Sequence, residues 1–124
     1  MNLMKSISER LTIEEHNGRQ FVFVDYRGLK EKEMIELVNE HLQLTIRVKL
    51  PFIADYRGTF GTPGYMTHAR NFAQSTKQII DKGALLGIDH VKSFILKGVV
   101  LMIGVNYKSF DNKDEAIKFI IDKK

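Results

Sequence analysis

The sequence predicts an α/β fold: a mixed, mostly parallel β-sheet with an N-terminal β-hairpin and about four helices packed on it. Short apolar runs alternate with segments whose apolar residues recur every three or four positions, as expected for strands that alternate with helices. The tetrapeptide Asp-Tyr-Arg-Gly occurs at 25–28 and again at 55–58, thirty residues apart. That spacing is about the length of one strand–helix–strand unit. Two parallel strands would therefore bring both copies to the same edge of the sheet, where ligands bind in open α/β sheets.

The first predicted elements form a hairpin. Apolar and polar residues alternate from Leu11 to His16, which is the pattern of a half-buried strand. Asn17-Gly18 follows at once and favours a two-residue turn. Residues 10–16 should then pair antiparallel with residues 19–25. Because residues 21–24 are continuously apolar, the second strand should lie inside the sheet.

The middle of the chain predicts two helices around a strand. An apolar stripe predicts a helix over residues 30–46. Pro51 then requires an extended entry into a strand at 52–55. Thr62 before Pro63 is typical of a helix cap followed by a first-turn proline, and Gly83 is typical of a helix stop. The second helix should therefore run between them.

The last third predicts a strand at 84–88, a helix, a strand at 105–110 and a final helix. Asp89 is placed to cap the third helix, and Gly104 to end it. Residues 99–103 alone also suit a strand, but the capping aspartate favours a helix to about 103. Asp111 or Asn112 caps the C-terminal helix.

Composition restricts the function classes. The 124 residues fit one domain over 1–124, and cysteine is absent, which removes disulfides and thiolate chemistry. The net charge of +4 comes from basic residues interleaved with acidic ones, so charge alone argues against nucleic-acid binding. The four histidines lack metal-ligand spacing, and common nucleotide and hydrolase motifs are missing. We expect no metal and no cofactor. The N-terminus lacks the apolar core of a signal peptide, so we expect a cytoplasmic protein.

The C-terminal third carries a resemblance to a known family. Residues 83–88 form a short apolar strand, and Phe110-Asp111 is followed by Glu115-Ala116 and an aromatic residue at 119. This pattern is similar to the STAS-like family of short, largely uncharacterised bacterial proteins, which is related in fold to the anti-sigma-factor antagonists. The order of elements along the whole chain also suits that family. The resemblance implies a non-catalytic module that binds a partner protein or a small anionic ligand in the bacterial cytoplasm.

The same resemblance implies a regulatory position. In the anti-sigma-factor antagonists, a serine is phosphorylated where the loop after the central strand enters its helix. The matching position lies near Thr62, with Thr59 as a second candidate. Here Gly-Thr-Pro-Gly at 61–64 replaces the Asp-Ser-Ser-Gly pattern of the phosphorylated members. Thr62 is therefore first interpreted as a helix cap.

The repeated tetrapeptide allows two interpretations. Asp25, Arg27, Asp55 and Arg57 at one sheet edge would suit an anion held by guanidinium and backbone N–H groups. Alternatively, the aspartates close their turns, the arginines pair with them, and the glycines supply positive backbone angles. A small enzyme working at this edge is a further alternative. The residues alone leave these interpretations open.

The third predicted helix is more apolar than one buried face requires. Residues 94–105 are interrupted only by Lys97, Gly98 and Gly104, and this run is shorter than the roughly 20 residues that span a bilayer. We expect a homodimer to which this helix contributes, because contiguous apolar surface usually marks an interaction site. A membrane-surface binder is the less favoured alternative. The candidate interface residues are Phe94, Ile95, Val99 and Met102.

Overall fold

The computed structural model describes residues 6–122, without the side chains at positions 90, 91 and 93–95. Its centre is a five-stranded sheet in the order β1-β2-β3-β4-β5. The first pair of strands is antiparallel and the other three pairs are parallel. The strands are β1 (Leu11–His16), β2 (Arg19–Asp25), β3 (Phe52–Asp55), β4 (Gly83–Leu86) and β5 (Tyr107–Phe110). The predicted mixed, mostly parallel sheet is confirmed.

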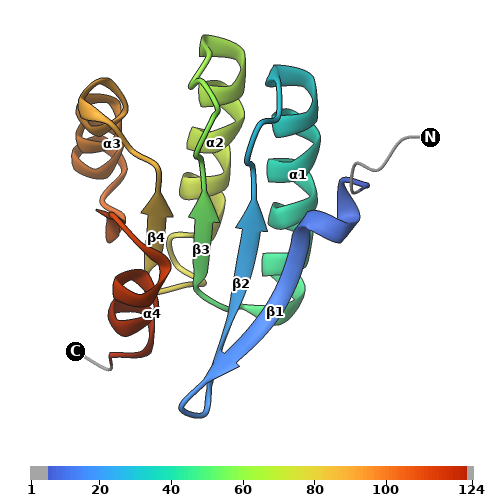
Figure 1. The fold of residues 1–124 in the computed structure, drawn as a ribbon, viewed down its shortest axis with the longest axis vertical. Coiled ribbons are helices and arrows are strands. Elements are labelled where there is room, and N and C mark those ends of the chain that lie inside the picture. Colours follow the sequence, from blue (N-terminus) through green and yellow to red (C-terminus); the bar gives the residue numbers. More distant parts are fainter. Residues whose placement is uncertain (1–5, 123–124) are drawn as a thin grey trace.

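Helices cover both faces of this sheet (Figure 1). One face carries α1 and α2, with α3 beside α2, and the opposite face carries α4. A short 3₁₀ turn, Ser8–Arg10, precedes the first strand. The helices are α1 (Glu31–Val48), α2 (Pro63–Thr76), α3 (His90–Ile103) and α4 (Lys113–Ile121).

Alternation along the strands produces two core layers. In β2 and β3, Val22, Val24, Phe52 and Ala54 face α1 and α2, whereas Ile53 belongs to the layer under α4. Successive side chains of a strand point to opposite faces, so a continuously apolar run can serve both layers. The interior position predicted for residues 21–24 is thus confirmed.

Several local predictions are confirmed by backbone geometry. Asn17 and Gly18 both have positive φ, 51° and 80°, as a two-residue hairpin turn requires. Asp89 accepts a hydrogen bond from Lys92 N, and Gly104 ends α3 in the left-handed conformation. Residues 99–103 are therefore helical. Asn112 rather than Asp111 caps α4.

The predicted end of the second helix is wrong. The helix stops at Thr76 rather than near Gly83. Thr76 O accepts hydrogen bonds from the backbone N of Ile79 at 2.8 Å and of Ile80 at 3.0 Å, which tightens the chain into a turn. Gly83 is the first residue of β4 instead, where a Cβ would lie 2.5 Å from Phe52 Cζ and 2.8 Å from Tyr107 Cδ1. This glycine makes room for two aromatic rings.

Candidate functional site

The two Asp-Tyr-Arg-Gly copies form neighbouring turns of the same shape at one edge of the sheet. Asp25 and Asp55 are partners in the register of β2 and β3. In each turn the aspartate accepts the backbone N–H of the arginine two residues later at 3.1 Å. The glycines that follow have φ of 71° and 72°, a conformation that side-chain-bearing residues rarely adopt. The sequence repeat is therefore a repeat of turn geometry, and its predicted common edge is confirmed.

Each carboxylate of this edge is paired with the arginine of its own turn. Asp25 Oδ1 lies 2.9 Å from Arg27 Nε, and Asp55 Oδ2 lies 2.6 Å from Arg57 Nη2. Both carboxylates are buried, and the Asp55 side chain has 0% exposure. Burial acts to raise the pKa of Asp25, but hydrogen bonds and charge from Arg27, with Arg10, hold this pKa below its usual value. The guanidiniums are thus fixed by their own turns, with 53% and 61% of their side chains exposed.

The tyrosine of each turn points the other way, into the layer between the sheet and the helices. The rings of Tyr26 and Tyr56 stack with 4.7 Å between their centroids. Tyr65 of α2 meets Tyr26 edge-on at 5.7 Å between centroids, and its hydroxyl shares a 2.6 Å hydrogen bond with that of Tyr56. The repeat therefore has a polar side, made by Asp and Arg, and an aromatic side, made by Tyr.

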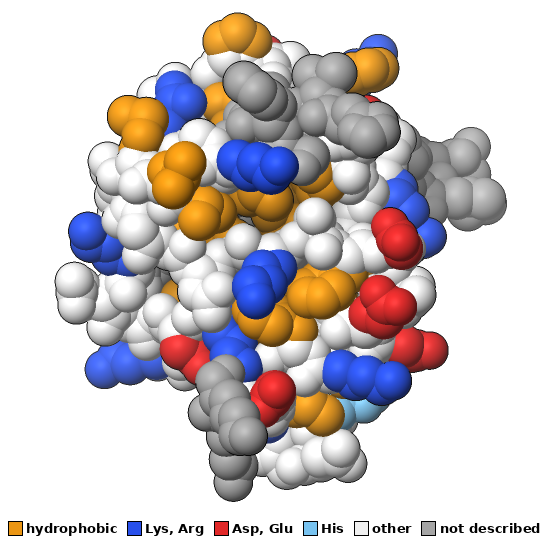
Figure 2. Space-filling model, turned by 90° about the vertical axis from the view of Figure 1, so that its left-hand side faces the viewer, with side chains coloured by type: hydrophobic (Ala, Val, Ile, Leu, Met, Phe, Trp, Pro, Cys, Tyr) orange, Lys and Arg blue, Asp and Glu red, His pale blue; other side chains and the backbone are white. Residues whose placement is uncertain are grey.

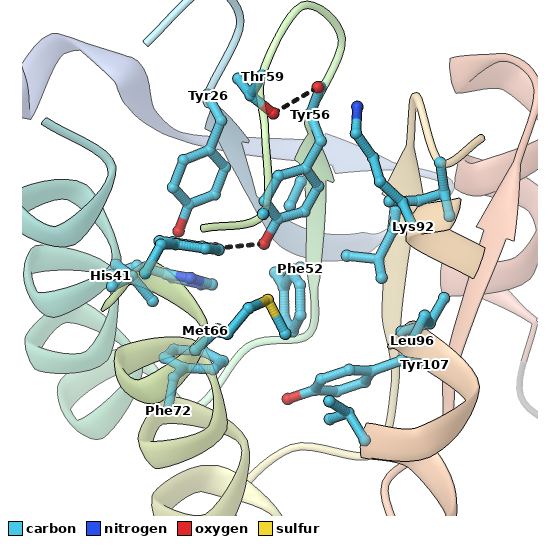
Figure 3. A pocket seen from close by; sticks show the side chains of 18 residues that line it. Tyr26, His41, Phe52, Tyr56, Thr59, Met66, Phe72, Lys92, Leu96 and Tyr107 are labelled. Carbon is cyan, nitrogen blue, oxygen red and sulfur yellow. Dashed lines mark hydrogen bonds between the residues drawn. The ribbon is translucent and has the colours of Figure 1, made fainter. Parts of the chain in front are cut away.

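These tyrosines line a pocket that the sequence analysis missed (Figure 3). The pocket has a volume of about 100 Å³ and lies among the sheet, α1, α2 and α3. Its walls are apolar and aromatic, and all four tyrosines of the chain line it. The lining residues that matter below are Tyr26, His41, Phe52, Tyr56, Tyr65, Ala69, Lys92 and Tyr107. Of the four tyrosines, Tyr65 lies on the apolar stripe of its predicted helix and Tyr107 in a predicted strand, whereas the other two lie in the predicted turns, so no single periodic pattern marks the pocket.

Two polar atoms of the pocket have no hydrogen-bond partner in the described part of the protein, His41 Nε2 and Tyr107 Oη. Their rings flank Phe52, with centroids 5.0 Å and 5.2 Å from its ring (Figure 3). The Thr76 side chain acts against the rise in the pKa of Tyr107, but the Thr76 hydroxyl gives its own proton to Phe72 O at 2.7 Å. Among the described residues, no hydrogen bond joins it to Tyr107 Oη. Unpaired buried polar groups are uncommon in folded proteins and call for a physical reason.

The histidine and the tyrosines of the pocket are un-ionised near neutral pH. Burial lowers the pKa of His41 to about 3, so its imidazole is neutral. Burial also raises the pKa of Tyr56 to about 12 and the pKa values of the other three tyrosines. Lys92 is the charged residue among those that line the pocket, and its Nζ donates to Gly87 O at 3.2 Å.

Comparison with solved structures identifies the fold. A DUF3478-family protein of uncharacterised function from Shewanella loihica, with a SpoIIAA-like fold, superposes with a TM-score of 0.69 at 12% identity, over 89% of this chain and 91% of that one. An anti-sigma-factor antagonist (STAS) domain protein from Planctomyces limnophilus superposes with a TM-score of 0.62 at 14% identity. This match covers 90% of this chain and 98% of that one. The chain has a STAS-like fold. No protein-family model and no curated protein matches the sequence.

The STAS-like fold places both candidate regulatory threonines beside the pocket. Thr62 is the N-cap of α2, where its Oγ1 accepts the Tyr65 N–H at 3.3 Å, so the predicted cap is confirmed. Thr59 lines the pocket and donates from Oγ1 to Tyr56 O at 2.7 Å (Figure 3). Both hydroxyls thus have structural roles in the loop that leads into α2. Phosphorylation of either residue stays the less favoured interpretation.

The candidate interface residues lie on α3. The side chains of Phe94 and Ile95 lie outside the described residues. Val99 is partly buried and lines the pocket, whereas Met102 is 85% exposed, next to the equally exposed Leu101. Figure 2 shows the side of the molecule that carries α3 and α4, where hydrophobic side chains occur in groups separated by lysines and arginines.

Two further features bear on the predicted classes. Within residues 6–122, no helix is both long enough and apolar enough to cross a membrane. In the same part of the chain, no three His, Asp or Glu side chains are grouped so that they could hold a metal ion. The polar groups that do gather are the paired charges of the two turns and the hydroxyls of the pocket.

Proposed function

We propose that this STAS-like protein is a non-catalytic module that binds a small, largely apolar molecule in the pocket among Tyr26, Tyr56, Tyr65 and Tyr107. The observation that carries the proposal is the pocket itself: about 100 Å³ of space walled by aromatic rings. Well-packed cores contain few voids larger than a water molecule. An apolar pocket with a few convergent polar groups is the usual form of a small-molecule site.

The size of the pocket suggests a ligand with one ring at its buried end. Its volume of about 100 Å³ is of the same order as the roughly 150 Å³ engineered cavity that stays dry and binds benzene in another protein. A single ring would meet aromatic partners on several sides, and aromatic pairs contribute about 0.5–1.5 kcal/mol beyond burial of their area.

The ionisation states support binding rather than catalysis. A general acid or base works best when its pKa lies near the operating pH. Burial lowers the pKa of His41 to about 3 and raises the pKa of Tyr56 to about 12. Both groups therefore hold one protonation state throughout the neutral range. Neutral hydrogen-bonding groups in an apolar wall orient a ligand without transferring its protons.

A direct titration tests this proposal. Toluene and p-cresol, two one-ring probes, are added to ¹⁵N-labelled protein, and amide chemical shifts report where each one binds. We expect saturable shifts at β3, β4 and α2 around the pocket. Ala69→Leu adds bulk to the pocket wall and should weaken binding at least tenfold. Gln74→Leu makes a similar addition on the exposed face of α2 and should leave binding unchanged. Absence of saturable shifts with both probes contradicts the proposal.

An anion site at the two turns is a second candidate. The side chains of Arg27 and Arg57 are 53% and 61% exposed, and they lie at the same edge of the sheet. This exposure favours an anion site. Each guanidinium already donates from Nε and Nη2 to its own aspartate, which leaves its other N–H groups for an anion. Inorganic phosphate is the probe. Shifts of the Arg27 and Arg57 Nε signals that saturate and disappear at high salt would support the site, and unchanged signals would contradict it.

A further inference from the structure

We infer that the pocket's ligand carries an uncharged oxygen group, a hydroxyl or a carbonyl, at its buried end, and that His41 Nε2 and Tyr107 Oη bind this group. The inference rests on the proposed binding function and adds the chemical class of the ligand. Both atoms lack a hydrogen-bond partner within the described residues. Both side chains line the pocket, from α1 and from β5.

The placement of the two groups fits one ligand group lying against Phe52. The His41 and Tyr107 rings both meet the Phe52 ring edge-to-face, at interplanar angles of 76° and 83°. Figure 3 shows the two rings on different sides of Phe52, with the Tyr107 hydroxyl below that ring, on the side toward α2. We place the ligand oxygen beside this ring, where it would be the shared hydrogen-bond partner of the two polar atoms.

The hydrogen-bond chemistry of the pair selects an oxygen. Tyr107 offers an O–H donor, and a neutral imidazole offers either an acceptor or a donor at Nε2, according to its tautomer. A ligand hydroxyl can accept from Tyr107 and donate to His41, whereas a carbonyl can accept from both. A purely apolar ligand would leave both atoms unpaired, and each unpaired buried group weakens the complex.

The charge distribution selects an uncharged group. His41 is only 2% exposed, and burial holds it in the neutral form. Apart from Lys92, the residues lining the pocket carry no acidic or basic side chain other than His41. The Lys92 ammonium is held at Gly87 O, 3.2 Å away, on the loop after β4. A carboxylate or ammonium beside Phe52 would lose its hydration without gaining an opposite charge.

The test compares two probes that differ by one hydroxyl, toluene and p-cresol, by ¹⁵N titration of the wild type, Tyr107→Phe and His41→Leu. We expect p-cresol to bind the wild type about tenfold more tightly than toluene. The p-cresol hydroxyl would pair with the two buried polar atoms, whereas toluene would leave them unpaired. Tyr107→Phe should remove most of this preference while still binding toluene. Ser109→Ala is the matched control, because it removes an exposed hydroxyl from the same strand, β5, outside the pocket lining, and the preference should persist in it.

The outcomes separate this inference from the proposed function. Equal affinities of toluene and p-cresol for the wild type would overturn the inference and leave the pocket as a purely apolar site. A preference that survives both Tyr107→Phe and His41→Leu would also overturn it. Failure of both probes to bind would instead remove the proposed function. Because Tyr107→Phe keeps the ring, it should fold, and if His41→Leu does not fold, the Tyr107 comparison alone decides.

Discussion

The rings of Tyr26 and Tyr56 lie parallel, with 4.7 Å between their centroids and 7° between their planes. These two tyrosines come from the two copies of one tetrapeptide, on adjacent parallel strand ends. The aspartate at the end of each strand closes its turn. The tyrosine that follows each aspartate faces the helices instead. The repeated turn therefore has a second effect beyond turn formation, because it places two phenols side by side in the wall of the pocket.

Removing the hydroxyl should change the free energy of unfolding differently at Tyr56 and at Tyr107. Tyr56→Phe leaves the Tyr65 hydroxyl without its 2.6 Å partner, so we expect unfolding free energy to fall by about 1 kcal/mol. Tyr107→Phe removes a hydroxyl that has no hydrogen-bond partner among the described residues and should leave stability unchanged or higher. Urea unfolding of both variants, followed by circular dichroism, makes the comparison. A loss in Tyr107→Phe as large as that in Tyr56→Phe would contradict the assigned hydrogen bonds.

The Asp55 turn should matter more for stability than a surface ion pair. Asp55 is buried and accepts hydrogen bonds from the backbone N–H and the side chain of Arg57. Asp55→Ala should cost about 2–4 kcal/mol through loss of these charge-assisted bonds. Asp81 makes a comparable contact with Arg19 at 2.9 Å, but its side chain is 53% exposed, so Asp81→Ala should cost at most about 1 kcal/mol. Equal losses in urea unfolding would contradict the structural role of the turn.

Acid should destabilise the protein through His41. Its pKa is lowered from 6.5 to about 3 in the folded state, so below pH 6.5 the unfolded chain takes up a proton that the folded chain does not. The contribution of His41 to the free energy of unfolding is therefore highest above pH 6.5, where the residue is neutral in both states, and it falls as the pH decreases toward 3. The slope should be about 1.4 kcal/mol per pH unit between those values.

His41→Leu should remove this slope, whereas His16→Gln, at an exposed position, should keep it. Urea unfolding at pH 7, 6, 5 and 4.5 measures the slope in each variant. Because Asp25 also has a lowered pKa, the difference between wild type and His41→Leu isolates the histidine. If that difference does not change with pH, His41 is not buried in neutral form.

Two glycine substitutions should move stability in opposite directions. Gly83→Ala places a Cβ 2.5 Å from the Phe52 ring, which must displace the ring and should cost about 1–3 kcal/mol. Gly98 lies within α3, and no atom of the described residues lies within 4 Å of its added Cβ, so Gly98→Ala should stabilise the helix by about 1 kcal/mol. Thermal unfolding measures both. A Gly83→Ala variant as stable as the wild type would contradict the close packing under the pocket.

The predicted homodimer has a test on the exposed end of α3. Met102 is 85% exposed, so a dimer that uses this helix would bury it. We expect size-exclusion chromatography with light scattering to give a dimer at micromolar concentration and Met102→Lys to weaken it. The matched control is Thr67→Lys on the exposed face of α2, which should leave the assembly unchanged. A wild-type monomer would contradict the prediction.

Most of the fold was predictable because each element carries its own local signal. The Asn17-Gly18 turn, the aspartate cap of α3 and the stop at Gly104 each depend on a few neighbouring residues, and each is confirmed. The end of α2 was not predictable in this way. Ile79 and Ile80 continue the helical spacing, but the chain turns after Thr76, and Gly83 is needed where two rings approach the strand.

The pocket was hidden for a different reason. Tyr65 lies on the apolar stripe of its helix, and the tyrosines of the two turns sit between an aspartate and an arginine that drew attention to charge. The alternation of side chains along extended backbone could have shown that Tyr26 and Tyr56 face away from their charged neighbours. Their convergence with Tyr107 depends on how the last strand and α3 pack, and no local pattern contains that information.

The most direct test of the binding site follows the four tyrosines themselves. Because the chain has four tyrosines and all of them line the pocket, ¹³C-tyrosine-labelled protein reports on this site alone. On titration with p-cresol, we predict that the tyrosine ring signals shift together with one dissociation constant and that Ala69→Leu abolishes the shifts. Tyrosine signals that stay unchanged while p-cresol saturates amide shifts elsewhere on the protein would contradict the account.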